Sequence, residues 1–101
     1  MLESLGYRVL MALDGPEALR VYGARQGQID LVLTDAKLLE MSGLDLLDGL
    51  MQINPSVKVI MMSGQNLQWI KDRRIVTLEA VLQKPIVWSQ LKEAVRKALA
   101  E

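Results

Sequence analysis

Short runs of aliphatic and β-branched residues recur along this chain, and each is followed by a stretch with helical spacing or turn residues. The strand-like runs are residues 7–13, 29–35, 57–64 and 80–85. They are almost continuously apolar instead of alternating with polar residues, so both faces of each strand are expected to be buried. Strands of this kind belong to parallel sheets covered by helices. The sequence therefore predicts an α/β fold with a parallel sheet and helices on both faces.

Helices are predicted between these strands from apolar spacing and from end signals. The predicted ranges are residues 16–27, 44–53 and 88–101. Pro16 and Glu17 suit the first turn of a helix, and Asn54-Pro55 marks the end of the second one. Residues 66–79 are ambiguous, with a helical first half.

Composition narrows the function classes. The chain has 101 residues, so we expect residues 1–101 to form a single domain. Its formal charge is zero, which argues against a nucleic-acid or membrane partner. It has no cysteine and no histidine, which excludes disulfides, zinc-thiolate sites and histidine-based triads. Its apolar runs are too short to span a bilayer and no signal peptide is evident, so we expect a cytoplasmic protein.

Three polar side chains follow predicted strands directly. Asp35 ends the second strand, Ser63 ends the third, and Lys84 lies at the end of the fourth. The carboxyl ends of parallel strands form one edge of a sheet, where ligands usually bind. A carboxylate there can attack a phosphoryl group while an ammonium and a hydroxyl bind the phosphoryl oxygens. Each residue taken alone is more often a turn or cap residue.

Taken together, the order and spacing resemble the receiver domain of two-component response regulators. The matching motifs are "DLVLTD" ending in Asp35, "MSGLDLL" with Gly43, "VKVIMMSG" with Ser63, and "LQKP" with Lys84-Pro85. The resemblance implies a flavodoxin-like fold in which Asp35 accepts a phosphoryl group from a histidine kinase or phosphotransfer protein. It also implies that Ser63 and Lys84 contact this group, and that the Lys84-Pro85 peptide is cis.

The chain departs from that family at its amino end. "MLESLGYRV" is similar to the end of the family's first helix, so we expect the first strand and its acidic pair, which binds Mg²⁺, to be missing. The fold is then truncated to about four strands, and the Mg²⁺ that the resemblance implies lacks those ligands. Leu39 stands where the family often has proline, and Val81 where it has an aromatic switch residue.

In the sheet that the resemblance implies, the missing strand lies between the strands that correspond to residues 7–13 and 29–35. Its absence would leave a gap there. Two repairs are open: residues 7–13 pair directly with residues 29–35, or a strand from a second copy enters the gap. Either favours a homodimer. The first repair would bring Asp14 and Glu17 near the lost acidic pair, so we assign Asp35, Lys37 and Asp14 to a candidate cation site. Helix capping by Asp14 and Glu17 is the alternative.

These observations predict a receiver-like phosphoacceptor with impaired metal-dependent phosphotransfer. We expect no enzymatic activity beyond self-phosphorylation at Asp35 from a phosphodonor. The alternative is a non-catalytic dimerisation or protein-interaction module that retains the receiver fold. Whether the chain is a natural short protein or a piece of a longer one stays open.

Overall fold

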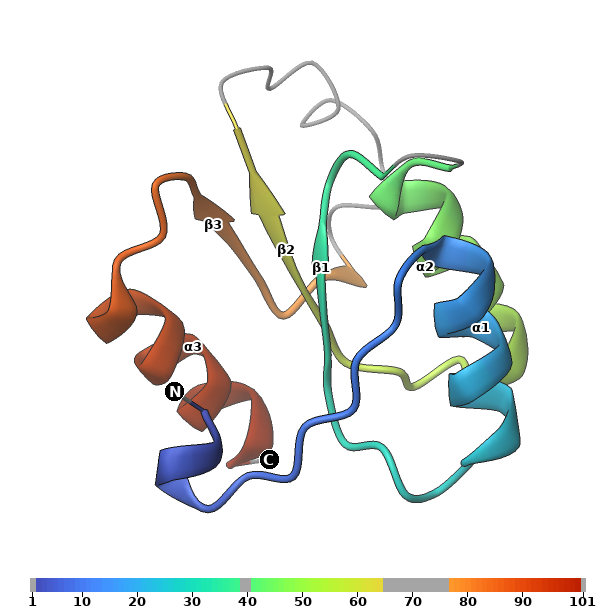
Figure 1. Cartoon of the computed structure of the whole chain (residues 1–101), viewed down its shortest axis with the longest axis horizontal. Coiled ribbons are helices and arrows are strands. Elements are labelled where there is room, and N and C mark those ends of the chain that lie inside the picture. The colour runs from blue at the N-terminus through green and yellow to red at the C-terminus, as the bar shows by residue number, and fades with distance from the viewer. Residues whose placement is uncertain (1, 39–40, 65–76, 101) are drawn as a thin grey trace.

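Three parallel strands form the centre of the molecule (Figure 1). The computed structural model describes residues 2–38, 41–64 and 77–100. The strands are β1 (Val32–Asp35), β2 (Val59–Ser63) and β3 (Ala80–Gln83), in the order β1-β2-β3. The helices are the 3₁₀ turn η1 (Glu3–Leu5) and the α-helices α1 (Gly15–Ala24), α2 (Gly43–Ile53) and α3 (Trp88–Leu99). Within the described ranges, no helix is long and apolar enough to cross a lipid bilayer.

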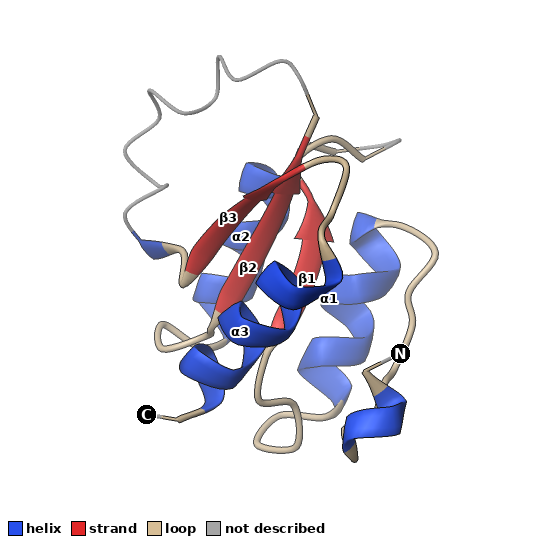
Figure 2. Ribbon diagram, turned by 90° about the vertical axis from the view of Figure 1, so that its left-hand side faces the viewer, coloured by secondary structure: helices blue, strands red, loops and turns tan. Residues whose placement is uncertain are grey.

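Helices cover both faces of the sheet, as predicted (Figure 2). The central strand β2 explains why, because Val59, Ile60 and Met61 are all fully buried. Successive side chains of a strand point to opposite faces. Val59 and Met61 accordingly pack with α1 and α2, while Ile60 packs with α3. A strand buried in this way requires apolar cover on both sides.

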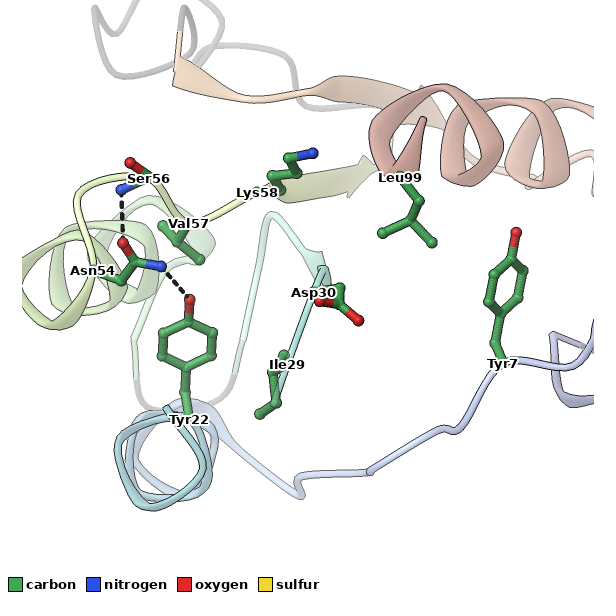
Figure 3. Close-up of a pocket in the computed structure, with 9 residues that line it drawn as sticks. All are labelled: Tyr7, Tyr22, Ile29, Asp30, Asn54, Ser56, Val57, Lys58 and Leu99. Carbon is green, nitrogen blue, oxygen red and sulfur yellow. Dashed lines mark hydrogen bonds between the residues drawn. The ribbon is translucent and has the colours of Figure 1, made fainter. Parts of the chain in front are cut away.

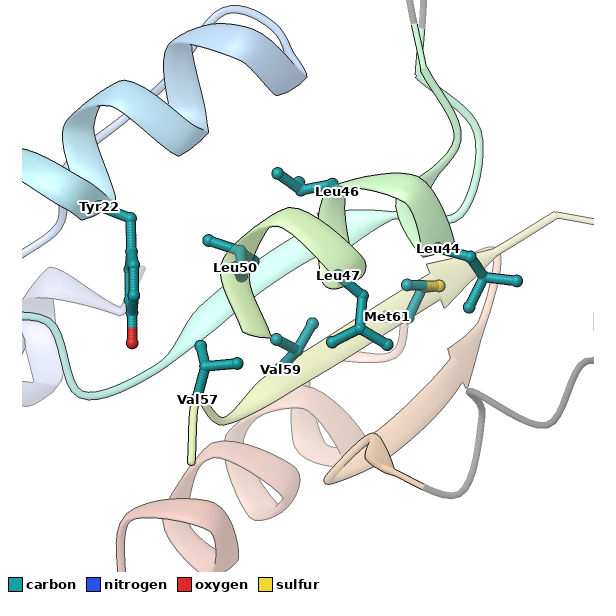
Figure 4. Packing of buried hydrophobic residues seen from close by; sticks show 8 residues of the cluster. All are labelled: Tyr22, Leu44, Leu46, Leu47, Leu50, Val57, Val59 and Met61. Carbon is teal, nitrogen blue, oxygen red and sulfur yellow. The ribbon is translucent and has the colours of Figure 1, made fainter. Parts of the chain in front are cut away.

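The larger core lies between the sheet and the pair α1 and α2 (Figure 4). Its buried members come from both helices, from β2 and from the turn before β2: Tyr22, Leu44, Leu46, Leu47, Leu50, Val57, Val59 and Met61. Their spacing on α2 follows the helical period that the sequence displays. The smaller core joins Ile60 to Leu91, Val95 and Ala98 of α3.

Side-chain caps fix where the first two helices begin. Asp14 accepts a hydrogen bond of 2.8 Å from the backbone N–H of Glu17, and Ser42 accepts one of 3.0 Å from that of Asp45. Such caps satisfy N–H groups that have no partner inside the helix. The capping role that we considered for Asp14 is therefore the one observed, and α2 is directed to begin beside the loop that follows β1.

Residues 7–13, predicted as a strand, do not form one. They run past β1 on the side away from β2 (Figures 1 and 2), and their backbone makes no hydrogen bond with any other described residue. Sequence preference alone does not make a strand, because a strand also needs hydrogen-bonded pairing, and these residues do not pair with the open edge of β1. The described sheet consequently has three strands where about four were predicted, and direct pairing with β1 does not occur.

We call residues 7–14 the amino-terminal strap. One end is held by Tyr7, which packs against the smaller core, and the other by Asp14, which caps α1. The side chains between these ends are exposed: Val9, Leu10, Met11 and Leu13, at 42%, 52%, 84% and 89%. Residues 66–76 of the ambiguous segment 66–79 lie outside the described residues. Leu39 also lies outside them.

A substitution at the start of α2 tests how closely this helix approaches β1. Gly43→Ala is expected to lower the free energy of unfolding by about 1–3 kcal/mol through overpacking. A Cβ at Gly43 would collide with the carbonyl oxygen of Asp35 and lie 3.0 Å from Ala36 Cα. Urea denaturation followed by circular dichroism measures the change.

The matched control is Gly23→Ala inside α1. A Cβ there would meet only Ile53 Cδ1, at 3.7 Å. This substitution is expected to raise stability by about 0.5 kcal/mol, because alanine loses less conformational freedom on folding. Equal effects of the two substitutions would contradict the close approach at Gly43.

Candidate functional site

Asp35 and Lys84 meet at the carboxyl edge of the sheet. Asp35 is the last residue of β1, and Lys84 follows the last residue of β3. Lys84 Nζ lies 2.7 Å from Asp35 Oδ1. Since β2 separates β1 from β3, the lysine side chain extends across the end of β2 to make this contact. The two side chains are 40% and 47% exposed for Asp35 and Lys84, so a solute can reach the pair.

Ser63 lies between these two residues in the sheet. It ends β2, and its carbonyl oxygen accepts a 2.7 Å hydrogen bond from the backbone N–H of Lys84. Its side chain is buried, and its Oγ donates a hydrogen bond of 3.3 Å to the carbonyl of Gly64. The predicted trio thus occupies neighbouring strand ends, and the direct side-chain contact within it is that of Asp35 with Lys84.

The loop after β1 is fixed to the start of α2. Lys37 forms an isolated antiparallel bridge with Ser42, and Gly43 donates a 2.8 Å backbone hydrogen bond to the carbonyl of Ala36. Because Gly43 has no Cβ, the end of α2 can approach the Asp35 backbone closely. The amino end of α2 is therefore positioned next to the carboxylate-bearing residue.

Thr34 is a residue of this region that the sequence analysis did not single out. It is buried, and its Oγ1 donates a 3.0 Å hydrogen bond to the carbonyl of Asp35. A hydroxyl inside an otherwise apolar run, one residue before the carboxylate, was the available signal. This bond satisfies a buried hydroxyl and helps hold the Asp35 backbone in place.

The residues assigned to a candidate cation site make other contacts in the structure. Mg²⁺ prefers octahedral coordination by oxygen atoms, usually including one or two carboxylates. Asp35 Oδ1 is already paired with Lys84, Asp14 caps α1, and Lys37 lies in the bridged loop. Among the residues described, no group of three or more His, Cys, Asp or Glu could hold a metal ion. The described residues therefore show no preformed cluster of acidic ligands, and the cation assignment stays a prediction.

The Lys84-Pro85 peptide bond is cis, as the resemblance implied. Lys84 itself continues the backbone pairing of β3 with β2, whereas Pro85 has no N–H to continue it. The chain turns away at this point toward the start of α3 at Trp88. The lysine is thus the last residue at this edge before the chain leaves the sheet.

A hollow of about 510 Å³ lies at the opposite end of the strands (Figure 3). Ile29 and Asp30 precede β1, and Lys58 precedes β2, so this hollow is at the amino ends of the strands. Tyr22 and Asn54 also line it, and Asn54 Nδ2 donates a 3.1 Å hydrogen bond to Tyr22 Oη. The hollow is therefore separate from the edge that carries Asp35 and Lys84.

The sheet, its two helical layers and this edge define a flavodoxin-like α/β protein. A family model described as "Response regulator receiver domain" matches residues 1–96. The chain belongs to this receiver domain family. The resemblance found from the motifs is thereby confirmed.

Curated relatives share about a third of their residues with the chain over the matched region. The transcriptional regulatory protein ZraR of Salmonella typhimurium is 31% identical over 99% of this chain, and the sensor kinase CckA of Brucella abortus is 34% identical over 97%. The chain spans 22% of the length of ZraR and 10% of that of CckA. The match thus concerns one part of these longer proteins.

Solved receiver structures superpose on the whole described fold. A receiver domain protein from Clostridium thermocellum gives a TM-score of 0.87 at 29% identity, covering 98% of this chain and 79% of that one. The receiver domain of NtrX from Brucella abortus gives 0.86 at 26% identity, covering 98% and 83%. These matches confirm the predicted fold class.

The exposure of the Asp35–Lys84 pair predicts a small contribution to stability. Lys84→Met is expected to change the free energy of unfolding by less than about 1 kcal/mol, as for exposed ion pairs in general. Leu50→Ala, at a fully buried position of α2, is the reference and should cost about 2–5 kcal/mol. Chemical denaturation of both variants makes the comparison. A loss at Lys84→Met as large as that at Leu50→Ala would mean that the pair is a major structural contact.

Proposed function

We propose that the chain is a receiver-like unit in which Asp35 accepts a phosphoryl group during two-component signalling. The observation that carries the proposal is the ion pair of Lys84 Nζ with Asp35 Oδ1, 2.7 Å apart, at the carboxyl edge of a parallel sheet. An ammonium held beside a carboxylate can stabilise the charge of a phosphoryl group that is transferred to that carboxylate. Membership of the receiver family supports the same role.

The transfer begins with attack of an Asp35 carboxylate oxygen on the phosphorus of a phosphohistidine or of acetyl phosphate. A bond forms between that oxygen and phosphorus, while the bond from phosphorus to the donor's nitrogen or oxygen breaks. The leaving group keeps the electron pair: a histidine nitrogen then takes a proton from water, whereas acetate leaves as its anion. Because Lys84 engages Oδ1, we assign Oδ2 as the attacking oxygen. Lys84 then holds a phosphoryl oxygen, and the hydroxyl of Ser63 turns to donate a hydrogen bond to another.

Phosphotransfer in this chain should be slow. Charge around the incoming group is balanced mainly by the Lys84 ammonium, since the described residues include no cluster of three or more acidic side chains that could hold a cation. Preorganised positive charge commonly contributes a large part of the catalysis of phosphoryl transfer. The chain therefore acts as an acceptor with impaired chemistry, and not as an enzyme on an external substrate.

The partners follow from this role. The phosphodonor is a histidine kinase or a phosphotransfer protein, and the location is the cytoplasm. Nucleic acid and membrane are not proposed as partners, in line with the zero formal charge. Residues 1–101 act as one receiver-like unit within this scheme.

A second candidate function is a non-catalytic interaction module that works by self-association. The exposed apolar side chains of the amino-terminal strap favour it, with Met11 and Leu13 more than four-fifths exposed. Val81 adds to this view, because a small side chain, 36% exposed, stands where the family resemblance implies an aromatic switch residue. In this second function, contact between copies of the chain replaces signal output through an aromatic switch residue.

Intact-mass spectrometry after incubation with acetyl phosphate tests the phosphoacceptor role. The protein should gain the mass of one phosphoryl group, and Asp35→Asn should gain none. Lys84→Met should be labelled about tenfold more slowly, because the attacking carboxylate loses its partner charge. The control variant Asp30→Asn removes a carboxylate that lies just before β1, at the other end of this strand from Asp35. It should be labelled at the same rate as the unmodified protein. Labelling that persists in Asp35→Asn would rule out Asp35 as the acceptor.

The dependence of labelling on metal tests the cation assignment. The rate with Mg²⁺ and the rate with a chelator should agree within about twofold, because the described residues offer no cluster of acidic side chains to fix the ion. The same mass measurement, taken over time, gives both rates. A tenfold or greater acceleration by Mg²⁺ that Asp14→Asn abolishes would instead establish a cation site that includes Asp14.

A further inference from the structure

The amino-terminal strap presents apolar side chains that the described elements leave partly or mostly exposed. Val9, Leu10, Met11 and Leu13 are between 42% and 89% exposed, and the backbone of residues 7–13 has no hydrogen-bond partner among the described residues. Four exposed apolar side chains in five residues, with unpaired backbone groups, are typical of a surface that binds another strand. We propose that a second copy of this chain covers the strap by pairing its own strap antiparallel to it.

The strap sequence is complementary to itself in this orientation. Residues 8–14 read Arg-Val-Leu-Met-Ala-Leu-Asp, with Met11 at the centre. Antiparallel pairing about Met11 places Arg8 opposite Asp14 of the second copy, and Val9 opposite its Leu13. A two-fold axis through Met11 repeats both pairs, as a closed dimer requires. Opposite charges at both ends and apolar pairs between them are favourable cross-strand neighbours.

The two faces of such a pair also match. In an extended strand, residues at alternate positions share a face, so pairing over residues 8–14 requires the bend at Leu13 and Asp14 to open. Val9, Met11 and Leu13 then form one wholly apolar face, while Leu10 and Ala12 form the centre of the other, between the charged ends. No apolar side chain of the strap is placed opposite a charged one, so the register is set by the sequence itself.

Both ends of the strap are anchored to the rest of the same protein chain. Its central residues are therefore the part that a second copy can bind. Tyr7 packs with the core beside α3, and Asp14 caps α1 by accepting from Glu17 N. Between these points the strap forms no backbone hydrogen bond with β1. A carboxylate can accept several hydrogen bonds, so the cap leaves Asp14 able to pair with Arg8 of the second copy.

The interface is small, which fixes the expected strength. Seven residues on each side are far fewer than the 20–30 of a standard interface, so the dissociation constant should be about 10–100 µM. Sedimentation velocity on a concentration series should therefore show monomer and dimer in exchange. This association does not depend on phosphorylation, so Asp35→Asn should associate like the unmodified protein even if the phosphoacceptor role fails.

Met11→Lys tests the axis of the proposed dimer. It places two ammonium groups opposite each other and should weaken association at least tenfold. Met11 is 84% exposed, so the variant should keep its circular dichroism and melting temperature. Gln52→Lys adds the same charge to an exposed position of α2 and should leave association unchanged.

Cysteine pairs test the register without relying on that variant, because the chain has no cysteine of its own. In a mixture of Val9→Cys and Leu13→Cys proteins, opposite residues lie about 5 Å apart and can form a disulfide. Either protein alone should not link, since two Val9 positions are about 13 Å apart across the axis. Mild oxidation followed by non-reducing electrophoresis reads the products.

Several outcomes would overturn the proposal. One is a monomer at every concentration up to about 0.5 mM. A second is a dimer that Met11→Lys does not weaken, which would place the interface elsewhere. A third is equal linking of the mixed and the single cysteine proteins. Finally, a monomer whose amides at residues 7–13 resist hydrogen exchange would mean that the strap pairs with its own β1.

Discussion

The burial of β2 on both faces is the constraint on which the rest of the structure depends. Val59, Ile60 and Met61 are inaccessible to solvent, and three adjacent apolar side chains of a strand need cover on alternating sides. This requirement brings α1 and α2 to one face and α3 to the other. It also aligns the carboxyl ends of the parallel strands, so that Asp35 and Lys84 can meet across β2.

The same arrangement links packing to the chemistry of the edge. Gly43 begins the helix that contributes most to the larger core, and it also lies against the carbonyl of Asp35. The position of the carboxylate is therefore set by the core beneath α2 as well as by β1. The Ala36–Gly43 hydrogen bond adds a further link between the strand end and α2, while the Thr34 hydroxyl binds the carbonyl of Asp35 within β1 itself.

The sequence predicted this part of the fold because each element carried its own evidence. Continuous apolar runs predicted β1, β2 and β3, and periodic leucines predicted α2 within about a residue of its observed bounds. Asp35, Ser63 and Lys84 were predicted as site residues from the shared edge of parallel strands, and they lie at neighbouring strand ends. Residues 7–13 were misassigned because their composition favours a strand, whereas a strand also needs a partner, which composition does not report. Thr34 was missed because its role depends on burial and not on residue type.

The Asp35–Lys84 contact joins the two outer strands of the described sheet, which share no backbone hydrogen bonds with each other. An anion that binds the Lys84 ammonium would compete with Asp35 for it and repel the Asp35 carboxylate, so the contact between the outer strands would weaken. Binding of an anion at this edge would therefore affect both the turn into α2 and the turn into α3. The separation of β1 and β3 at the carboxyl edge is then the structural change that couples a bound anion to both helical layers.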